Sequence, residues 1–333
     1  MITTVRVPLR ICLGGGGTDL PEFSTRFPGF VVSATINKFI TITVRPRADN
    51  KVRFFWDEYE EVDDIHTTPL QHQLLPNAMK RANWWIKHHG VDVAALSDMP
   101  PQSGMGSSGS FLVGALKALS HDNPSCDWWS TNQLAEEAYN VEREMLGRRV
   151  GRQDHYIAAF GGCRAFTFGP HVHPDNTTIR VTPVLWTEET KATLESRLGL
   201  YWTGVRRDAS QQLTLQADKL QELDEATIQR LKRTSELGHV AFSHLISGDL
   251  DGWAAACHEH SQLKQALSGE SPLDEHRRTA LLAGAKAAKL VGAGAGGYLL
   301  CYAHDITAIT EVMKVSGLPR IPFKFHDKGV EVL

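Results

Sequence analysis

A loop of glycines and serines that runs directly into an apolar helix is the sequence feature that most constrains this chain. It spans residues 100–119 and reads PPQSGMGSSGSFLVGALKAL. Glycines permit positive φ and close approach, so backbone N–H groups can converge on an anion. The following helix N-terminus adds unpaired donors and partial positive charge. The segment predicts a phosphate-binding loop without the Walker ending; a flexible loop before a helix is the simpler alternative.

A second glycine run lies near the start of the chain, in LRICLGGGGTDL at residues 9–20. Four glycines alone indicate a tight turn, and a dinucleotide fingerprint would need G-x-G-x-x-G. Here the run is flanked by Arg10 and Asp19, with Thr18 beside the acid. A carboxylate can accept from sugar hydroxyls, and an arginine can steady phosphoryl charge. A third run, KLVGAGAGGYLL at residues 289–300, is by itself more typical of a tight packing turn.

Strand and helix patterns extend over the whole chain and favour an α+β fold over a doubly wound one, because strands do not simply alternate with helices. Alternation predicts strands at 5–9, 39–44, 51–56, 91–96, 163–168, 179–185, 198–203, 298–303 and 321–326. Apolar periodicity predicts helices at 69–89, 108–119, 131–146, 187–197, 224–247, 250–268 and 305–316. Ser130 or Thr131 is the expected cap of the third helix. The polar segment 171–178 is the expected lobe boundary, which divides the chain into residues 1–170 and 171–333.

Composition excludes several classes of protein. The 333 residues carry 35 Lys plus Arg against 38 Asp plus Glu, a net charge of −3, which argues against nucleic acid or an anionic membrane as a partner. Five cysteines are widely separated and form no CxxC, which favours reduced thiols in the cytoplasm. The histidine pairs 171/173 and 258/260 lack partners at zinc spacing, and the second pair is expected on the surface.

Taken together, the three glycine segments resemble the GHMP small-molecule kinase superfamily, which includes galactokinase and mevalonate kinase, and the resemblance covers essentially the whole chain. Residues 100–110 are similar to its motif PxxxGLGSSAA, with Met105 in place of leucine and Gly109-Ser110 in place of the small pair. The stretches LGGGGTDLPEF, GRQDHYIAAFGG and YWTGVRRDAS resemble the D-glycero-D-manno-heptose 7-phosphate 1-kinase branch. The implied fold has an N-terminal ribosomal-S5-like α/β lobe and a C-terminal ferredoxin-like α+β lobe.

The resemblance also assigns roles to residues. Asp154 matches the aspartate at the reacting hydroxyl, and Arg10 matches a basic residue near the γ-phosphate. Ser108 and Glu142 would ligate Mg²⁺ between the ATP phosphates, and hard oxygen ligands suit this ion. The residues implied at the ATP phosphates are Ser103, Gly104, Gly106, Ser107, Ser108 and Gly109. The residues implied at the sugar are Gly16, Gly17, Thr18, Asp19, Gln153, Arg207 and Gly294.

The implied reaction is ATP-dependent phosphorylation of the anomeric C1 hydroxyl of D-glycero-D-manno-heptose 7-phosphate. The product, a 1,7-bisphosphate, would serve nucleotide-heptose and surface polysaccharide synthesis. A substrate that already bears a phosphate needs a second cationic site, for which the candidates are Arg148, Arg149, Arg152 and Arg207. Each of these arginines taken singly is more typical of a solvated surface charge. ATP, Mg²⁺ and the sugar phosphate are the expected ligands, and a homodimer is the oligomer that we consider.

Two other functions remain open from the sequence. One is a kinase for an unphosphorylated sugar, either fucose-type or another hexose. The other is a GHMP-fold protein that binds a sugar or nucleotide without turnover. The presence of Asp154, Glu142, Ser108 and Arg10 argues against a pure binder, which needs neither a base nor a metal ligand. The hypothesis of a dinucleotide-dependent oxidoreductase is weaker, because no proper dinucleotide-binding fingerprint follows the first strand.

Overall fold

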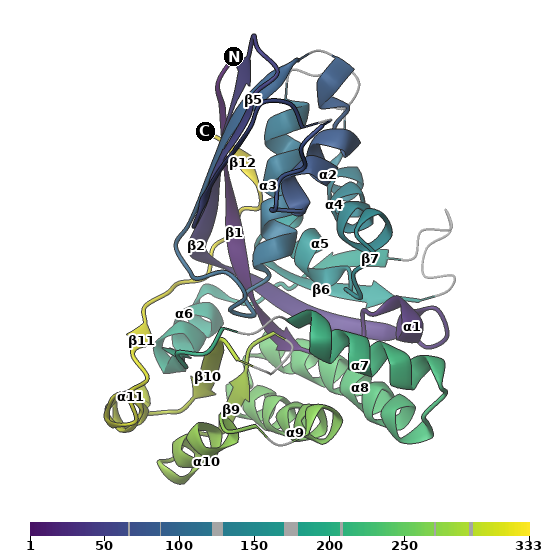
Figure 1. Cartoon of the computed structure of the whole chain (residues 1–333). Helices are drawn as coiled ribbons and strands as arrows, with labels where there is room; N and C mark the ends of the chain where they lie inside the picture. Colours follow the sequence, from purple (N-terminus) through teal and green to yellow (C-terminus); the bar gives the residue numbers. More distant parts are fainter. Residues whose placement is uncertain are drawn as a thin grey trace.

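Two long antiparallel strands, β1 (Thr3–Gly14) and β2 (Gly29–Arg47), organise the larger of two sheets in the computed structural model (Figure 1). The structure describes residues 1–65, 67–86, 88–121, 129–169, 179–206, 209–269, 271–292 and 296–333. One half of β2 pairs with β5 (Gly90–Ser97) and the other half with β6 (Cys163–Phe168). The long strands therefore reach from the first lobe to its junction with the second.

Shorter strands complete this sheet at its edges. They are β3 (Val52–Phe55), β4 (Tyr59–Val62), β7 (Ile179–Pro183) and β12 (Glu331–Val332). β3 runs parallel to β5, whereas the other pairings in the sheet are antiparallel. β7 pairs with β6 and β12 with β1. The first lobe thus takes two strands from beyond residue 170, so the chain is not divided cleanly at the expected boundary.

Helices cover one face of this sheet (Figure 1). They are α2 (Leu74–Arg81), α3 (Ser107–Ser120), α4 (Thr131–Asn140) and α5 (Gln153–Phe160), with a 3₁₀ turn at Trp84–Ile86. α3 is buried along most of its length, as its run of apolar and small residues predicts. Ser130 caps α4 in a capping box with Gln133, which confirms the first of the two expected caps.

The second lobe is built on a four-stranded antiparallel sheet. Its strands are β8 (Leu198–Trp202), β9 (Ala287–Leu290), β10 (Tyr298–Tyr302) and β11 (Arg320–Ile321). The spatial order is β11-β8-β10-β9, which is 4-1-3-2 in chain order. This is the strand order expected of a ferredoxin-like lobe. The prediction of an α+β fold with two lobes is confirmed.

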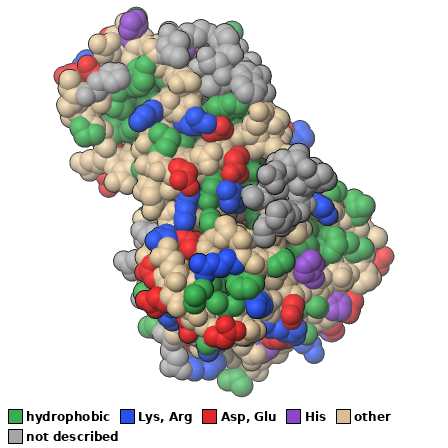
Figure 2. Space-filling model, turned by 90° about the vertical axis from the view of Figure 1, so that its right-hand side faces the viewer, with side chains coloured by type: hydrophobic (Ala, Val, Ile, Leu, Met, Phe, Trp, Pro, Cys, Tyr) green, Lys and Arg blue, Asp and Glu red, His purple; other side chains and the backbone are tan. Residues whose placement is uncertain are grey.

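The remaining helices pack around the second sheet and against the end of the first. They are α1 (Pro21–Ser24), α6 (Glu188–Arg197), α7 (Ala209–Gln221), α8 (Glu225–Ser247), α9 (Leu250–Ser268), α10 (Asp274–Leu282) and α11 (Ile306–Val315). α8 lies against β1 and β2, where a Cβ at Gly238 would come within 2.6 Å of the Phe30 carbonyl oxygen. Glycine at that position lets the helix approach the strand closely. Figure 2 shows charged side chains of both signs where the upper and lower parts of the molecule meet.

Several expected boundaries differ from the structure. The helix expected at 69–89 is shorter, because Asn83 adopts φ 50° between α2 and the 3₁₀ turn. The helix expected at 131–146 changes at Val141–Met145 into a π-helical turn. The strand expected at 321–326 was wrong: β11 ends at Ile321, and residues 322–326 contribute only an isolated bridge, between Ile36 and Phe325. The segment 171–178 lies outside the described residues.

None of the described helices is both long enough and apolar enough to cross a membrane.

Candidate active site

A cavity of about 280 Å³ lies where the two lobes meet. Its walls come from the glycine turn after β1, the loop before α3, the start of α5, and the second-lobe elements α7, α9 and β9. Twelve of the residues assigned to the site from the sequence line it together. They are Arg10, Gly16, Gly17, Asp19, Ser103, Gly104, Gly106, Ser107, Ser108, Glu142, Gln153 and Asp154. Segments from residue 10 to residue 154 thus converge on one cavity.

An ion pair between Arg10 and Asp154 occupies the centre of the site. Arg10 Nε and Nη2 donate to the two carboxylate oxygens at 2.7 Å each. The Arg10 side chain is 5% exposed, whereas that of Asp154 is 27% exposed and remains accessible from the cavity. Arg10 Nη1 also donates to the Gly104 carbonyl. The arginine therefore fixes the aspartate and the glycine loop relative to each other.

The glycine loop depends on two residues with positive φ. Gly104 and Gly106 have φ of 79° and 78°, and Gly106 caps the N-terminus of α3 in the left-handed conformation. The Oγ atoms of Ser103 and Ser107 are buried and find no hydrogen-bond partner within the described residues. Both serines line the cavity next to the free N–H groups of the α3 N-terminus. Such a set of donors suits a phosphate group.

The third glycine run packs against this loop. A Cβ at Gly292 would lie 2.5 Å from Gly104 Cα, and a Cβ at Gly297 would lie 2.0 Å from the Ser103 carbonyl oxygen. Both glycines have positive φ. The run therefore acts as a packing turn that holds the phosphate loop, as its composition alone suggested. Gly294, which was expected to contact the sugar, lies outside the described residues.

Glu142 sits in the π-helical turn and is 2% exposed. Its Oε2 lies 3.0 Å from His155 Nε2, and its Oε1 accepts from Arg148 at 3.3 Å. Burial would raise the pKa of Glu142, but the hydrogen bond and charge of His155, with help from Ser108 and Arg148, hold it below its usual value. The carboxylate is thus kept ionised in a buried position. A π turn within a helix is frequent at functional sites.

The residues expected to hold Mg²⁺ fit that ion in chemistry and number. Ser108 and Glu142 both line the cavity, and the Ser108 hydroxyl is close enough to influence the Glu142 pKa. The described residues contain no cluster of three or more His, Cys, Asp or Glu that could hold a metal by itself. Mg²⁺ commonly takes one or two protein oxygens and completes its shell with phosphates and water. His155 supports Glu142 from α5.

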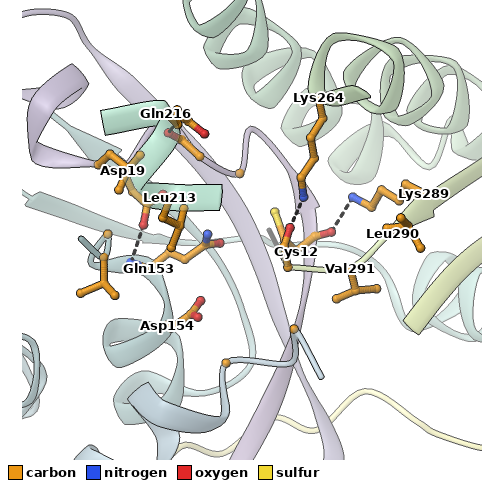
Figure 3. Close-up of a pocket in the computed structure, with 18 of the residues that line it drawn as sticks. Cys12, Asp19, Gln153, Asp154, Leu213, Gln216, Lys264, Lys289, Leu290 and Val291 are labelled. Atoms are coloured by element: carbon orange, nitrogen blue, oxygen red, sulfur yellow. Dashed lines mark hydrogen bonds between the residues drawn. The ribbon is translucent and has the colours of Figure 1, made fainter. Parts of the chain in front are cut away.

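Asp19 and Gln153 form the opposite end of the predicted site. One carboxylate oxygen of Asp19 accepts the Gln153 N–H at 3.0 Å, and Ser33 donates to the Gln153 side-chain oxygen at 3.0 Å. Burial raises the pKa of Asp19, and the nearby Asp154 charge adds to this effect. Figure 3 shows Asp19, Gln153 and Asp154 on the same side of the cavity. Convergent carboxylate and amide groups of this kind suit a polyhydroxylated ligand.

One prediction for a described residue needs correction, and a second residue has a packing role. Thr18 is fully buried and does not line the cavity; its hydroxyl donates to the Gly15 carbonyl at 2.8 Å and accepts the Phe30 N–H at 3.1 Å. It therefore fixes the glycine turn. Gly109 also lies behind the cavity wall, where a Cβ would come within 3.0 Å of Asp154 Cβ. Its missing side chain lets α3 approach α5, and the contribution of its backbone N–H to phosphate binding stays a prediction.

The arginines proposed for a second phosphate are mostly engaged elsewhere. Arg149 donates to Glu22, and Arg152 pairs with Glu136 while it stacks on Tyr139. Arg148 lines the cavity but is paired with Glu142. Arg207 lies outside the described residues.

Polar side chains that the sequence did not identify line the second-lobe wall. Among them are Gln216, His260, Lys264 and Lys289. Gln216 donates to the Gly17 carbonyl at 3.1 Å from α7, a helix that the sequence did not predict. The expectation that His260 lies on the surface was wrong, since it is only 5% exposed. Its spacing from Lys264 (i, i+4) places both on one helix face, which is the signal that could have found them.

Comparisons with known proteins show what the chain is similar to. Residues 73–162 match the family model described as the GHMP kinases N terminal domain. The chain is 28% identical to D-glycero-alpha-D-manno-heptose 7-phosphate kinase from Campylobacter jejuni subsp. jejuni, over 98% of this chain and 97% of that protein.

Two solved structures that are less than 25% identical to this chain share its fold. A D-glycero-D-manno-heptose 1-phosphate kinase from Bacteriodes thetaiotaomicron has a TM-score of 0.80 at 22% identity and covers 100% of this chain and 99% of its own. Lactococcus lactis galactokinase complexed with galactose has a TM-score of 0.73 at 19% identity, with coverage of 100% and 95%.

Fold and cavity together give a two-lobed protein with a glycine loop at the lobe junction. The chain carries a GHMP kinase N-terminal domain at residues 73–162, as the glycine motif at residues 100–110 indicated. The expectation of an enzyme of the kinase class is confirmed by the matches to kinases.

Proposed function

We propose that this protein transfers the γ-phosphoryl group of ATP to the anomeric C1 hydroxyl of D-glycero-D-manno-heptose 7-phosphate. The observation that carries the proposal is the bidentate Arg10–Asp154 pair, which lies directly beside the glycine loop and is open to the cavity. The 28% identity to a heptose 7-phosphate kinase over nearly the whole chain supports this choice of substrate.

Asp154 and Arg10 would have complementary roles in the transfer. A carboxylate at Asp154 accepts the proton of the attacking hydroxyl or orients that hydroxyl toward the phosphorus. Arg10, held 2.7 Å from that carboxylate, neutralises negative charge on the phosphoryl group as it moves. Most of the rate enhancement then comes from positioning and electrostatics, and no covalent intermediate on the protein is needed.

The glycine loop would bind the ATP phosphates. Ser103, Ser107 and the α3 N-terminus supply hydroxyl and N–H donors that have no partners within the described part of the protein. Ser108 and Glu142 would hold Mg²⁺ against those phosphates. When bound, the ion supplies neutralising charge to the phosphate oxygens. His155 and Arg148 keep the Glu142 carboxylate in place.

The sugar would lie between Asp19, Gln153 and the glycine turn. The Asp19 carboxylate has one oxygen engaged by the Gln153 N–H, which leaves acceptor capacity for sugar hydroxyls. Gly16 and Gly17 leave this part of the wall open to the ligand. Arg207 and Gly294 remain predictions from the family resemblance. A cytoplasmic location, where ATP is available and thiols stay reduced, agrees with free Cys12, Cys163, Cys257 and Cys301.

A panel of sugars tests the proposal. Purified protein is mixed with Mg-ATP and either D-glycero-D-manno-heptose 7-phosphate, the same heptose without phosphate, fucose or galactose, and ADP release is followed. We expect the highest kcat/KM with heptose 7-phosphate. Faster turnover of an unphosphorylated sugar would favour the alternative kinase, and ATP binding without ADP release on any sugar would favour a non-catalytic binder.

A further inference from the structure

Two lysines of the second lobe converge on the cavity from the side opposite Asp19, Gln153 and Asp154 (Figure 3). Lys289 on β9 is 7% exposed and donates to the Cys12 carbonyl at 2.6 Å. Lys264 on α9 donates to the Gly292 carbonyl. Both ammonium groups therefore reach the same part of the cavity from different elements.

The charge of this region is the reason to assign it a ligand. Burial, reinforced by the neighbouring charges of Lys289 and Arg10, lowers the pKa of Lys264 to about 8. Near pH 7 the lysine is thus still mainly protonated. Backbone carbonyls compensate only part of a buried unit charge, and like charges brought together in a protein interior repel each other. An anion in the cavity would relieve both costs.

His260 adds an acceptor to the same wall. It lies one turn before Lys264 on α9, and its Nε2 is 3.3 Å from the Gly16 carbonyl oxygen. Burial lowers the pKa of His260 to about 3, so the ring is neutral near pH 7. Because a carbonyl only accepts, Nε2 carries the proton and Nδ1 is an acceptor. Nδ1 is buried and has no partner among the described residues, so a ligand hydroxyl can donate to it.

We propose that Lys264 and Lys289 bind the phosphate that the substrate already carries, and that His260 accepts a hydrogen bond from a hydroxyl near that phosphate. The inference deepens the proposed function, on which it rests, by making this wall the specificity element for a phosphorylated sugar. Two ammonium donors and one neutral acceptor match a phosphate ester on a polyhydroxylated molecule. The arginines first considered for this role, Arg149 and Arg152, are engaged by carboxylates outside the cavity.

The first test removes the charge of each lysine and keeps a side chain of similar length. Lys264→Met and Lys289→Met are assayed with D-glycero-D-manno-heptose 7-phosphate and with the unphosphorylated heptose, at saturating Mg-ATP. Each variant is expected to raise KM for the phosphorylated sugar by about tenfold or more, the size of one lost charge-assisted contact. KM for the unphosphorylated heptose and for ATP stays within about twofold. Lys264→Arg restores most of the affinity, and Lys286→Met, which removes an exposed lysine outside the cavity, changes neither sugar's KM.

Two kinetic results would overturn the inference. One is an equal rise in KM for both sugars, which would give the lysines a general structural role. The other is a selective rise in KM for ATP, which would assign them to the γ-phosphate.

A binding measurement separates this inference from the proposed reaction. Thermal unfolding midpoints are measured with heptose 7-phosphate and with the unphosphorylated heptose, without ATP. We expect heptose 7-phosphate to raise the midpoint of the wild-type protein and to raise it much less in the two methionine variants, whereas the unphosphorylated heptose gives the same shift in all three proteins, because a ligand stabilises only the state that binds it. Equal shifts with heptose 7-phosphate in wild type and variants would refute the phosphate subsite even if the kinase reaction is confirmed. A wild type that turns over only unphosphorylated sugars would refute the proposed reaction, while the midpoint shifts still decide the anion site.

Discussion

The two walls of the cavity give their buried cations different partners. On the first-lobe wall each cation is paired with a carboxylate, as Arg10 is with Asp154 and Arg148 is with Glu142. On the second-lobe wall Lys264 and Lys289 donate to backbone carbonyls, beside an ion pair between Arg277 and Asp274. The two arginines of the first wall are thus neutralised before any ligand arrives, whereas the two lysines add positive charge to the second wall.

The difference separates catalysis from recognition. Groups that act on the transferring phosphoryl group must be held in position in advance, and reciprocal ion pairs do this at little reorganisation cost. A wall that recognises an anionic substrate needs positive charge that the negative charge of the bound substrate neutralises. Changes on the first wall should therefore reduce kcat, and changes on the second should raise KM for a phosphorylated sugar.

Asp154→Asn is the change with the largest expected effect. It removes the proton acceptor and the charge partner of Arg10, so kcat should fall by about 10²- to 10⁴-fold. ATP affinity, measured by titration calorimetry, should stay within about threefold, because the phosphate loop does not depend on this carboxylate for its donors. Asp218→Asn on the exposed face of α7 is the matched control and should leave kcat unchanged. Full activity of the Asp154 variant would remove it from the mechanism.

Glu142→Gln is expected to act through Mg²⁺. The amide keeps the size of the side chain but loses the charge that His155 and Arg148 hold in place. The Mg²⁺ concentration for half-maximal activity should rise by about 10- to 100-fold. Glu136→Gln, which changes an acid paired with Arg152 outside the cavity, should leave the Mg²⁺ dependence as it is. An identical Mg²⁺ titration for both variants would contradict the metal assignment.

The pH dependence of kcat/KM tests the role of the second wall. Lys264 must be protonated to bind a phosphate, and its pKa of about 8 means that this form is lost as pH rises through 8. The groups around it are Lys289, Arg10, His260 and Cys12. Between pH 7 and pH 9, kcat/KM for heptose 7-phosphate should fall about tenfold relative to the unphosphorylated heptose. Lys264→Arg should abolish this difference, because arginine stays charged; an unchanged fall would exclude Lys264 as its source.

Arg149→Met should have the smallest effect. The side chain is 30% exposed and paired with Glu22 away from the cavity, so KM for heptose 7-phosphate should stay within about twofold. Steady-state kinetics of this variant and of Lys289→Met, measured side by side, give the comparison directly. A tenfold rise in the Arg149 variant alone would return the phosphate subsite to the arginine segment.

The first wall could be predicted well from the sequence. Arg10, the loop 103–108, Glu142 and Asp154 belong to motifs whose glycines and hydroxyls have a local physical meaning, and they meet in the cavity as expected. Thr18 was misassigned because a motif shows that a residue is required without showing which way it faces. Thr18 closes the turn, and Gly109 faces α5.

The second wall could not be predicted in the same way. His260 and Lys264 lie on a long helix whose pattern predicts only that it is partly buried, and Lys289 lies on a four-residue strand that the sequence did not predict. Their convergence on Cys12 and Gly16 depends on how α9 and β9 pack against the end of β1, and that is a long-range property of the fold. The α7 helix, which supplies Gln216, was missed for the same reason.

Identification of the product by ³¹P NMR tests the central claim most directly. The protein is incubated with Mg-ATP and D-glycero-D-manno-heptose 7-phosphate until ADP release stops. We predict one new phosphate monoester resonance, coupled to the anomeric proton, beside the unchanged 7-phosphate resonance. A new phosphate at any other position, or no new sugar phosphate when the unphosphorylated heptose is turned over instead, would contradict the claim that this protein is a C1 kinase for a phosphorylated heptose.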